Sequence, residues 1–349
     1  MDEVLGSMQT YDHEQLVFCN DNETGLRAII GIHNTVLGPA LGGTRMWDYS
    51  NEAEALTDVL RLSRGMTYKA AAAGLDLGGG KAVILGDPKK IKTEKLLLRF
   101  GKFIEGLAGR YITAGDVGMN SGDMISIGKA TKYVTGLPGK SGDPSPITAL
   151  GVYYAMKACA KEKWGNDSLS GKRIVVQGIG NVGENLVKLI AKEGAKVSIS
   201  DIDEARTSKV AKENGASVLN KDLIFDETMD IYAPCALGAV INSDSLKKLK
   251  CEVVCGAANN QLADEQLDGM EIMKKGILYA PDFVINAGGL ISVSSEISGL
   301  SAERVIELTK NIYGTTLNIF KVAGTENIPT YAAANRIAEK RIGEKKRGR

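Results

Sequence analysis

Apolar runs and amphipathic stretches alternate along the chain from Gln15 to about Gly136. The apolar runs are short and rich in β-branched and aromatic residues, which is typical of strands. Apolar residues after Asn51 recur at helical spacing, so a helix is predicted to start near this residue. The predicted strands are Leu16–Cys19, Ala28–Ile32, Ala82–Leu85 and Tyr111–Thr113. This part of the chain is therefore predicted to be an α/β domain.

A dense cluster of glycine and proline turn signals at residues 136–146 marks the best domain boundary. After a helical stretch, the pattern predicts a strand at Arg173–Gln177, a glycine-rich turn, a helix to Glu193 and a strand at Lys196–Ser200. This alternation continues to about Val293 and favours a parallel, doubly wound sheet. We therefore expect an α/β fold with an N-terminal domain (1–136), a Rossmann-type nucleotide domain (137–325) and a C-terminal helix with a solvated basic tail (326–349).

Charge and hydropathy exclude several classes of partner. The 43 basic and 42 acidic residues give a formal charge of +1, so no global field favours nucleic acid or an acidic membrane surface. No apolar run approaches the roughly 18 residues that a membrane helix needs. The N-terminus, Met1-Asp2-Glu3, is acidic, whereas a secretory signal is basic. We expect a small-molecule substrate, no nucleic-acid or membrane partner, and a cytoplasmic location.

The cysteines and histidines indicate neither a disulfide framework nor a metal site. The five cysteines are an odd number, and Cys251 and Cys255 have no second pair with metal-ligand spacing. A buried strand explains the segment between these two cysteines better. The only histidines, His13 and His33, lie near the N-terminus. Proton transfer is therefore expected to use Lys, Asp or Glu.

A dinucleotide fingerprint follows the strand at Arg173–Gln177. The segment Gly178-Ile179-Gly180-Asn181-Val182-Gly183 matches G-x-G-x-x-G, and Asp201 ends the next predicted strand. The first glycine permits a tight turn, the second lets the backbone approach a pyrophosphate, and the third allows close helix–strand packing. Asp201 would accept hydrogen bonds from the ribose hydroxyls and repel a 2′-phosphate. NAD is therefore expected, with NADP left open by the nearby Arg206, and a glycine turn in a nucleotide-free fold is the alternative.

Two lysines are candidates for acid–base chemistry. Lys69 precedes a run of alanines, and Lys81 follows Gly78–Gly80 and opens an apolar strand. Two ammonium groups in a desolvated site would lower the pKa of at least one, which makes it a usable base; the alternative is two solvated surface charges. The Walker phosphate-loop pattern fails, because Leu75 and Ala82 replace its first glycine and its Ser or Thr.

Two glycine-rich segments have either a structural or a functional interpretation. Asp116 lies in Thr113-Ala-Gly-Asp116-Val-Gly118 and is either a turn aspartate or a site residue. Gly42 and Gly43 form either a turn or a stretch of backbone N–H groups exposed to a carboxylate.

Seven motifs together resemble the NAD-dependent amino-acid dehydrogenases, which include the leucine, valine, phenylalanine and glutamate enzymes. The resemblance covers nearly the whole chain, in order. The motifs are GPALGGTR (38–45), GMTYK (65–69), GGGK (78–81), DVG (116–118), APCALG (233–238), AANNQ (257–261) and YAPDFVINAGG (279–289).

The resemblance implies a role for each matching residue. Lys69 matches the lysine that binds the α-carboxylate, helped by the backbone near Gly42 and Gly43. Lys81 matches the base that activates water, and Asp116 matches the aspartate that shuttles protons and holds the amino group. Two positions of the nucleotide domain are implied as well: Asn259 lines the substrate and nicotinamide cleft, and Thr148 is expected to hold the nicotinamide amide.

The implied reaction is the reversible oxidative deamination of an L-amino acid to a 2-oxo acid and ammonia, with NAD as cofactor. Family members are homo-oligomers, often octamers, so a homo-oligomer is expected here. A non-catalytic NAD-binding regulatory protein is the alternative from another class.

The residues that match the side-chain pocket favour an aliphatic substrate. Leu41 stands where glutamate enzymes carry a lysine for the distal carboxylate. Ala114, Leu290 and Val293 match other lining positions, so an unpaired substrate carboxylate would be costly there. We expect a branched-chain substrate, with L-leucine favoured and L-phenylalanine as the alternative. One departure is Gly115, which replaces the acidic residue expected before Asp116 in leucine enzymes and could loosen that loop.

Overall fold

The computed structural model describes residues 2–137 and 139–348. The chain forms two compact units. Unit 1 comprises Met1–Gly142, Val293–Gly299 and Ala338–Arg349, and unit 2 comprises Asp143–Ser292 and Leu300–Ile337. The units differ from the contiguous ranges expected from the sequence, because the chain crosses between them four times. The first crossing, after Gly142, lies inside the expected boundary segment 136–146.

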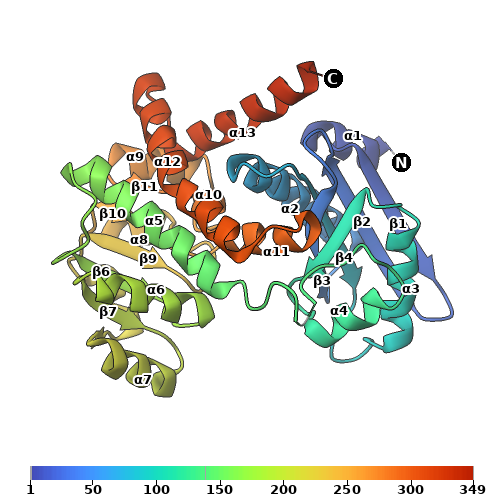
Figure 1. Cartoon of the computed structure of the whole chain (residues 1–349), viewed down its shortest axis with the longest axis horizontal. Coiled ribbons are helices and arrows are strands. Elements are labelled where there is room, and N and C mark those ends of the chain that lie inside the picture. The colour runs from blue at the N-terminus through green and yellow to red at the C-terminus, as the bar shows by residue number, and fades with distance from the viewer. Residues whose placement is uncertain (1, 138, 349) are drawn as a thin grey trace. The chain divides into compact units, whose positions relative to one another are not determined.

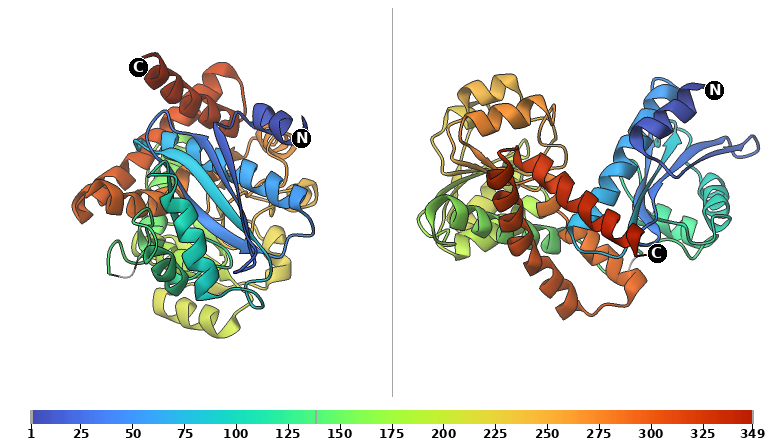
Figure 2. Two further views of the ribbon diagram at one scale, coloured as in Figure 1. Left: turned by 90° about the vertical axis from the view of Figure 1, so that its right-hand side faces the viewer. Right: turned by 90° about the horizontal axis from the view of Figure 1, so that it is seen from above.

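Unit 1 is a five-stranded mixed sheet with helices on both faces (Figures 1 and 2). The strand order is β1-β2-β4-β3-β5; β2 pairs antiparallel with β1 and β4, whereas β3 pairs parallel with β4 and β5. The predicted strands are confirmed, and so is the helix near Asn51, whose side chain caps α2 by accepting the Glu54 N–H. The elements are β1 (Gln15–Asp21), β2 (Leu26–Asn34), β3 (Ala40–Trp47), β4 (Gly78–Leu85), β5 (Tyr111–Gly115), α1 (Asp2–Tyr11), α2 (Glu52–Ala72), α3 (Glu94–Glu105) and α4 (Ser121–Gly128).

Alternating side chains of the central strands build two cores in unit 1. Successive strand residues point to opposite faces of a sheet. Ile29 and Val83 therefore pack with Val59 and Leu60 of α2. Their even-numbered neighbours in β2 and β4 pack on the other face with α3 and α4, together with Phe100.

Strand β3 was not among the strands predicted from the sequence, and the interpretation of Gly42 and Gly43 as a turn is wrong. Both glycines lie inside β3, opposite Thr113 and Ala114 of β5. A Cβ atom at Gly42 would overlap the carbonyl oxygen of Gly80 in β4. Glycine is therefore required here because two backbones approach closely, not because the chain turns.

Unit 2 is a parallel six-stranded sheet flanked by helices, as predicted (Figure 1). The strand order is β11-β10-β9-β6-β7-β8, and the sequence order reverses on either side of β6. Ligands of such sheets bind outside the carboxyl ends of the strands at this switch point. The strands are β6 (Arg173–Gln177), β7 (Lys196–Ser200), β8 (Ser217–Val218), β9 (Ile231–Pro234), β10 (Val253–Val254) and β11 (Leu278–Tyr279). The helices of unit 2 are α5 (Ser145–Trp164), α6 (Asn181–Lys192), α7 (Glu204–Asn214), α8 (Ser243–Lys248), α9 (Leu267–Lys274), α10 (Asp282–Ile285) and α12 (Ala302–Glu326), with a 3₁₀ helix at Lys221–Asp226. Two further helices, α11 (Gly288–Ser298) and α13 (Thr330–Arg347), each have residues in both units.

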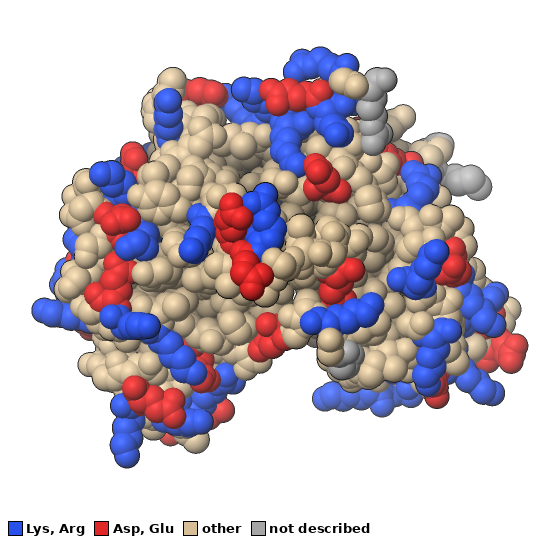
Figure 3. Space-filling model, viewed as in Figure 1, with Lys and Arg blue, Asp and Glu red and all other residues tan. Residues whose placement is uncertain are grey.

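Charge is mixed rather than segregated on the face drawn in Figure 3, where Lys and Arg side chains lie among Asp and Glu. This agrees with the near balance of 43 basic and 42 acidic residues. Within the described residues, no helix is both long enough and apolar enough to cross a membrane.

Arg341 in α13 is docked rather than solvated, so the expectation of a solvated basic tail is wrong for this residue and agrees only with the exposed residues 344–348. The Arg341 Nη1 donates to the carbonyl oxygens of Ala71 at 3.1 Å and Leu75 at 2.7 Å, and its Nη2 donates to Asp76 at 3.0 Å. These carbonyls lie at and just beyond the end of α2, where helix acceptors lack intrahelical partners. Ala338 packs in the same region, whereas residues 344–348 are exposed.

Replacing Arg341 should therefore destabilise unit 1. Arg341→Gln removes hydrogen bonds from a charged donor and is expected to lower the free energy of unfolding by about 1–3 kcal/mol. Urea unfolding followed by circular dichroism measures the change. The control is Lys346→Gln, which removes an exposed charge from the same helix and should have little effect. Equal stability of the two variants would contradict the docking role.

Candidate active site

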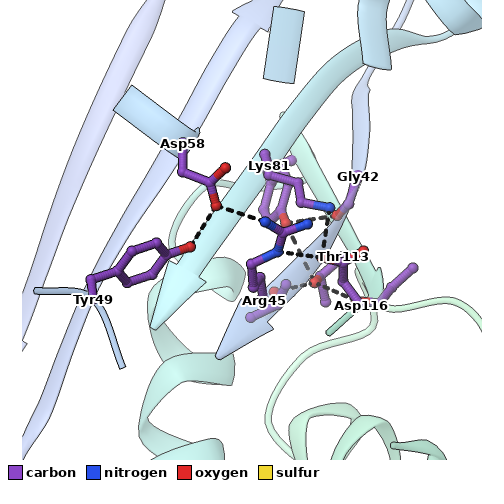
Figure 4. Close-up of polar contacts among 10 residues, drawn as sticks. Gly42, Arg45, Tyr49, Asp58, Lys81, Thr113 and Asp116 are labelled. Carbon is purple, nitrogen blue, oxygen red and sulfur yellow. Dashed lines mark hydrogen bonds and ion pairs between the residues drawn. The ribbon is translucent and has the colours of Figure 1, made fainter. Parts of the chain in front are cut away.

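A buried lysine and a carboxylate meet in unit 1. Lys81 lies in β4 and is only 5% exposed. Asp116 follows β5, on the far side of β3. The Lys81 Nζ lies 3.1 Å from Asp116 Oδ2. Figure 4 shows these two side chains together with Arg45. Strands β4 and β5 lie on either side of β3. The Lys81 and Asp116 side chains therefore meet next to β3, although the two residues are far apart in sequence.

An arginine completes this cluster, and the sequence analysis did not identify it. The Arg45 Nε donates to Asp116 Oδ2 at 3.0 Å, and its Nη1 donates to Asp58 Oδ2 at 2.9 Å. The Tyr49 hydroxyl donates to the same Asp58 oxygen at 2.6 Å. Arg45 ends the GPALGGTR motif, so the signal was present, but its partner lies 71 residues further along the chain.

Burial and ion pairing shift the pKa of both members of the central pair. Burial lowers the pKa of Lys81 below its ordinary value, although the neighbouring Asp116 charge acts in the opposite direction. Burial alone would raise the pKa of Asp116, but the charges of Lys81 and Arg45 outweigh it and hold this pKa below its ordinary value. The cluster therefore presents an ionised carboxylate beside a lysine that releases its proton more readily than a surface lysine.

Glycines allow Asp116 to reach this position. A Cβ atom at Gly43 would lie 2.9 Å from the Cβ of Asp116. Gly118 has a φ of 77° in the turn after Asp116, and a Cβ atom there would overlap the carbonyl oxygen of Met46. By contrast, Gly115 has only Met124 Cγ within 4 Å of a Cβ position, at 3.8 Å, and no positive φ. Gly115 is therefore not required by packing.

Lys69 lies half-buried in the last turn of α2. The glycines before Lys81 bring this helix against β4, because a Cβ atom at Gly79 would overlap the backbone nitrogen of Thr67. Lys69 and Lys81 each lie two residues beyond this crossing of helix and strand. The other candidates of this unit are Leu41, which is buried in β3, and Ala114 and Val293, which are half-buried in β5 and α11.

The dinucleotide fingerprint forms the expected strand–turn–helix in unit 2, at the carboxyl end of β6. Gly178 has a φ of 100°, which only glycine adopts readily, and a Cβ atom at Gly183 would overlap the carbonyl oxygen of Gly178. Gly180 caps α6, and a Cβ atom there would meet nothing within 4 Å. Packing within the protein therefore does not explain glycine at position 180. Ile179 is buried, and Asn181 and Val182 form the first turn of α6.

The Asp201 side chain is hydrogen-bonded to the same loop. One of its oxygens accepts the Ile179 N–H at 2.5 Å, and the other accepts the Asp203 N–H at 2.9 Å. Arg206, the residue that left NADP open, donates to Asn181 at 3.0 Å and pairs with Glu184 at 3.1 Å. Asp201 thus accepts hydrogen bonds from two backbone N–H groups, and Arg206 is engaged by Asn181 and Glu184.

The remaining candidates lie in unit 2. Thr148 is in the first turn of α5, and its hydroxyl donates to the Pro144 carbonyl at 3.0 Å. A Cβ atom at Gly289 would lie 2.7 Å from this hydroxyl. Asn259 is exposed, and its side-chain oxygen accepts a hydrogen bond from Asn286 at 2.8 Å. Leu290 is half-buried near the start of α11.

Comparison with known proteins places this fold and site in a family. Residues 13–133 match the model described as "Glu/Leu/Phe/Val dehydrogenase, dimerisation domain". Residues 139–205 and 199–349 match the model "Glutamate/Leucine/Phenylalanine/Valine dehydrogenase".

Individual relatives match over nearly their whole length. The chain is 53% identical to a leucine dehydrogenase of Bacillus subtilis, over 99% of this chain and 96% of the relative. It is 48% identical to a valine dehydrogenase of Streptomyces virginiae, over 95% and 94%. The crystal structure of L-tryptophan dehydrogenase from Nostoc punctiforme superposes with a TM-score of 0.91 at 44% identity, covering 99% of both chains.

The chain contains a Rossmann-type nucleotide-binding fold and a buried lysine–carboxylate pair. This combination is typical of an oxidoreductase that also exchanges protons with its substrate. The chain belongs to the glutamate/leucine/phenylalanine/valine dehydrogenase family. It is an amino-acid dehydrogenase that uses a nicotinamide dinucleotide, and the resemblance inferred from the seven motifs is confirmed.

The two glycines beside Asp116 should respond differently to replacement. Gly115→Ala is expected to stabilise the protein by about 0.4–1 kcal/mol, because it restricts the unfolded chain without a clash. Gly43→Ala should displace Asp116 and lower kcat. Urea unfolding and steady-state kinetics on both variants measure these effects. A loss of activity in Gly115→Ala as large as that in Gly43→Ala would contradict this assignment.

Proposed function

We propose that the chain catalyses the reversible NAD-dependent oxidative deamination of a branched-chain L-amino acid, with L-leucine favoured, to the 2-oxo acid and ammonia. The observation that carries the proposal is the 3.1 Å contact between the buried Lys81 ammonium and Asp116. Deamination needs a group that takes a proton from water near neutral pH, and a lysine whose pKa is lowered by burial meets that need. The identity of 50–53% to several leucine dehydrogenases supports the substrate.

Each side chain of unit 1 has a separate role in this proposal. The Lys69 ammonium binds the α-carboxylate, aided by the backbone at Gly42 and Gly43. A bound nicotinamide would supply a hydride acceptor for the α-carbon, and that carbon would then be an iminium carbon of the substrate. Neutral Lys81 takes a proton from the water that attacks this carbon. Asp116 accepts hydrogen bonds from the amino group and relays the proton that Lys81 took from the water to the departing ammonia, so that Asp116 is ionised again afterwards. Lys81 then takes the hydroxyl proton as the 2-oxo group forms.

In the reverse direction the same groups work with opposite protonation. Protonated Lys81 gives its proton to the oxygen that leaves as water, and ammonia must arrive neutral to attack the 2-oxo carbon. Both directions therefore depend on a lysine that exists in both forms within the working pH range.

The loop Gly178–Gly183 and Asp201 support NAD as the dinucleotide. A carboxylate has about four acceptor positions, and the Ile179 and Asp203 N–H groups occupy two of those on Asp201. The others are available to the ribose hydroxyls. A 2′-phosphate would meet the same negative charge, so NADP is disfavoured. We assign Thr148 to the nicotinamide amide and Asn259 to the substrate and nicotinamide, as the family resemblance implies.

The chemistry of the matching residues supports the choice of a branched side chain. Leu41 and Ala114 carry no charge that would neutralise a distal substrate carboxylate, and we assign Leu290 and Val293 to the substrate side chain as well, as the family resemblance implies. We also propose that the protein is a homo-oligomer. The description of the model that matches residues 13–133 as a dimerisation domain supports assembly. The family resemblance implies that octamers are frequent among its members.

A substrate and cofactor panel tests the proposed function. The values of kcat/KM for leucine and valine with NAD should exceed those for phenylalanine. They should exceed the value for glutamate by at least about a hundredfold, because an unpaired buried carboxylate costs several kcal/mol. Replacing NAD by NADP should lower kcat/KM. A preference for glutamate or phenylalanine would refute the substrate, and absence of NADH formation with every amino acid would refute the reaction.

Removing the proposed base should abolish turnover without affecting the dinucleotide site. Lys81→Ala is expected to lower kcat by at least about 10²-fold, which is the usual contribution of general base catalysis. NAD affinity, measured by calorimetry, should stay unchanged. The control is Lys89→Ala, which removes an exposed lysine from the loop after β4. Near-normal turnover of the Lys81 variant would exclude Lys81 as the base.

A further inference from the structure

We propose that Arg45 is a positioning residue for the reaction: it holds Asp116 by a permanent charge, so that Lys81 can gain and lose a proton while the carboxylate stays ionised and in place. This inference rests on the proposed function, because it assigns to Arg45 a part in the proton transfer of Lys81 and Asp116.

The geometry gives Asp116 two cations on one oxygen. Asp116 Oδ2 lies 3.1 Å from Lys81 Nζ and accepts the Arg45 Nε–H at 3.0 Å. If Lys81 were its only ion partner, the carboxylate would lose its counter-charge whenever Lys81 became neutral. Burial would then favour protonation or movement of Asp116. A guanidinium cannot be deprotonated in proteins, so Arg45 keeps the charge balanced in both states of Lys81.

A second carboxylate fixes the orientation of Arg45. Its Nη1 donates to Asp58 Oδ2 at 2.9 Å, and the Tyr49 hydroxyl donates to the same oxygen at 2.6 Å. Asp58 comes from α2 and Arg45 from β3, so the guanidinium links a helix to the strand that lies between β4 and β5. Two ion pairs in different directions leave the planar guanidinium little freedom to rotate.

The outer side of this arrangement is open to solvent. A pocket of about 520 Å³ lies on this side. It is lined by Arg45, Tyr49 and Asp58, together with Trp47, Glu54, Thr57, Arg61 and Val117. The side chains of Arg45 and Asp58 are each 25% exposed, whereas that of Lys81 is 7% exposed. Arg45 therefore lies between a solvent-accessible pocket and a lysine that is almost fully buried. This position allows it to hold the charge of Asp116 without being fully desolvated itself.

The charged and titratable groups around Lys81 determine the sign of the expected effect. Asp116 follows β5 and Asp58 lies on α2, and both negative charges raise the pKa of Lys81; Arg45 on β3 and burial lower it. Tyr111 of β5 is neutral because burial raises its pKa far above its ordinary value, and its hydroxyl donates to the Gly42 carbonyl. Removing Arg45 deletes one of the charges that lower the pKa of Lys81. It also leaves the negative charge of Asp116 with Lys81 as its remaining ion partner in the cluster. Both changes make Lys81 harder to deprotonate.

The test is the pH dependence of oxidative deamination in Arg45→Gln and Arg45→Lys, with L-leucine and NAD. In Arg45→Gln, the apparent pKa of the group that must be deprotonated should rise by about one unit or more, as expected for the loss of a neighbouring charge. Its kcat should fall, with NAD affinity unchanged. Arg45→Lys keeps the charge but cannot bridge two carboxylates, so its pH profile should stay close to that of the wild type while its kcat falls.

Arg61→Gln is the matched control, because it removes a positive charge that lines the same pocket; its kcat and pH profile should match the wild type. A pH profile of Arg45→Gln that coincides with the wild type would overturn the proposal. If Arg45→Gln does not fold, full kcat in Arg45→Lys overturns it instead. Wild-type protein that forms no NADH from any amino acid refutes the proposed function, and this inference with it. Active wild-type protein with unaltered Arg45 variants refutes this inference alone.

Discussion

One carboxylate oxygen, Asp116 Oδ2, accepts two cationic donors in a largely buried site, and the candidate active site of unit 1 is built around this contact. A buried lysine beside a carboxylate would normally form a stable ion pair and remain charged. Two features oppose that outcome: the burial of Lys81 and the second positive charge of Arg45. The balance between them gives a lysine with a lowered pKa next to an aspartate that remains ionised, which is a useful combination for proton transfer to and from water.

The cluster exists only because the backbones around it carry little side-chain bulk. Gly42 lets β3 approach β4, Gly43 lets Asp116 approach β3, and Gly79 lets α2 cross β4 next to Lys81. These close approaches bring charged side chains from β3, β4, α2 and the loop after β5 into one small volume. Clustering buried charges costs desolvation energy, which the ion pairs and hydrogen bonds of Asp116 offset. In unit 2, glycines again permit close backbone approach, but there the expected neighbour is a pyrophosphate.

Local patterns in the sequence predicted the parts of the fold that depend on local chemistry. The alternation of apolar residues found the strands of the first sheet apart from β3. The helix near Asn51 was found because apolar residues recur at helical spacing after it, and the capping role of the Asn51 side chain was added by the structure. Strand β3 was missed because glycine is common in turns. The need for glycine at position 42 arises from Gly80 in the neighbouring strand β4, which is distant in sequence. Arg45 and Arg341 were missed for the same physical reason: their acceptors are distant in sequence, so composition alone made them look like ordinary surface charges.

The central claim is that Lys81 releases its proton more readily than an ordinary lysine while Asp116 stays ionised. The most direct measurement is an NMR titration of protein labelled with ¹³C at the lysine ε-carbons, with the Lys81 resonance assigned by its loss in Lys81→Arg. The account predicts that this resonance titrates at lower pH than the exposed lysines of the same sample, with no protonation of Asp116 near neutral pH. A Lys81 resonance that titrates together with the exposed lysines, or above them, would contradict it.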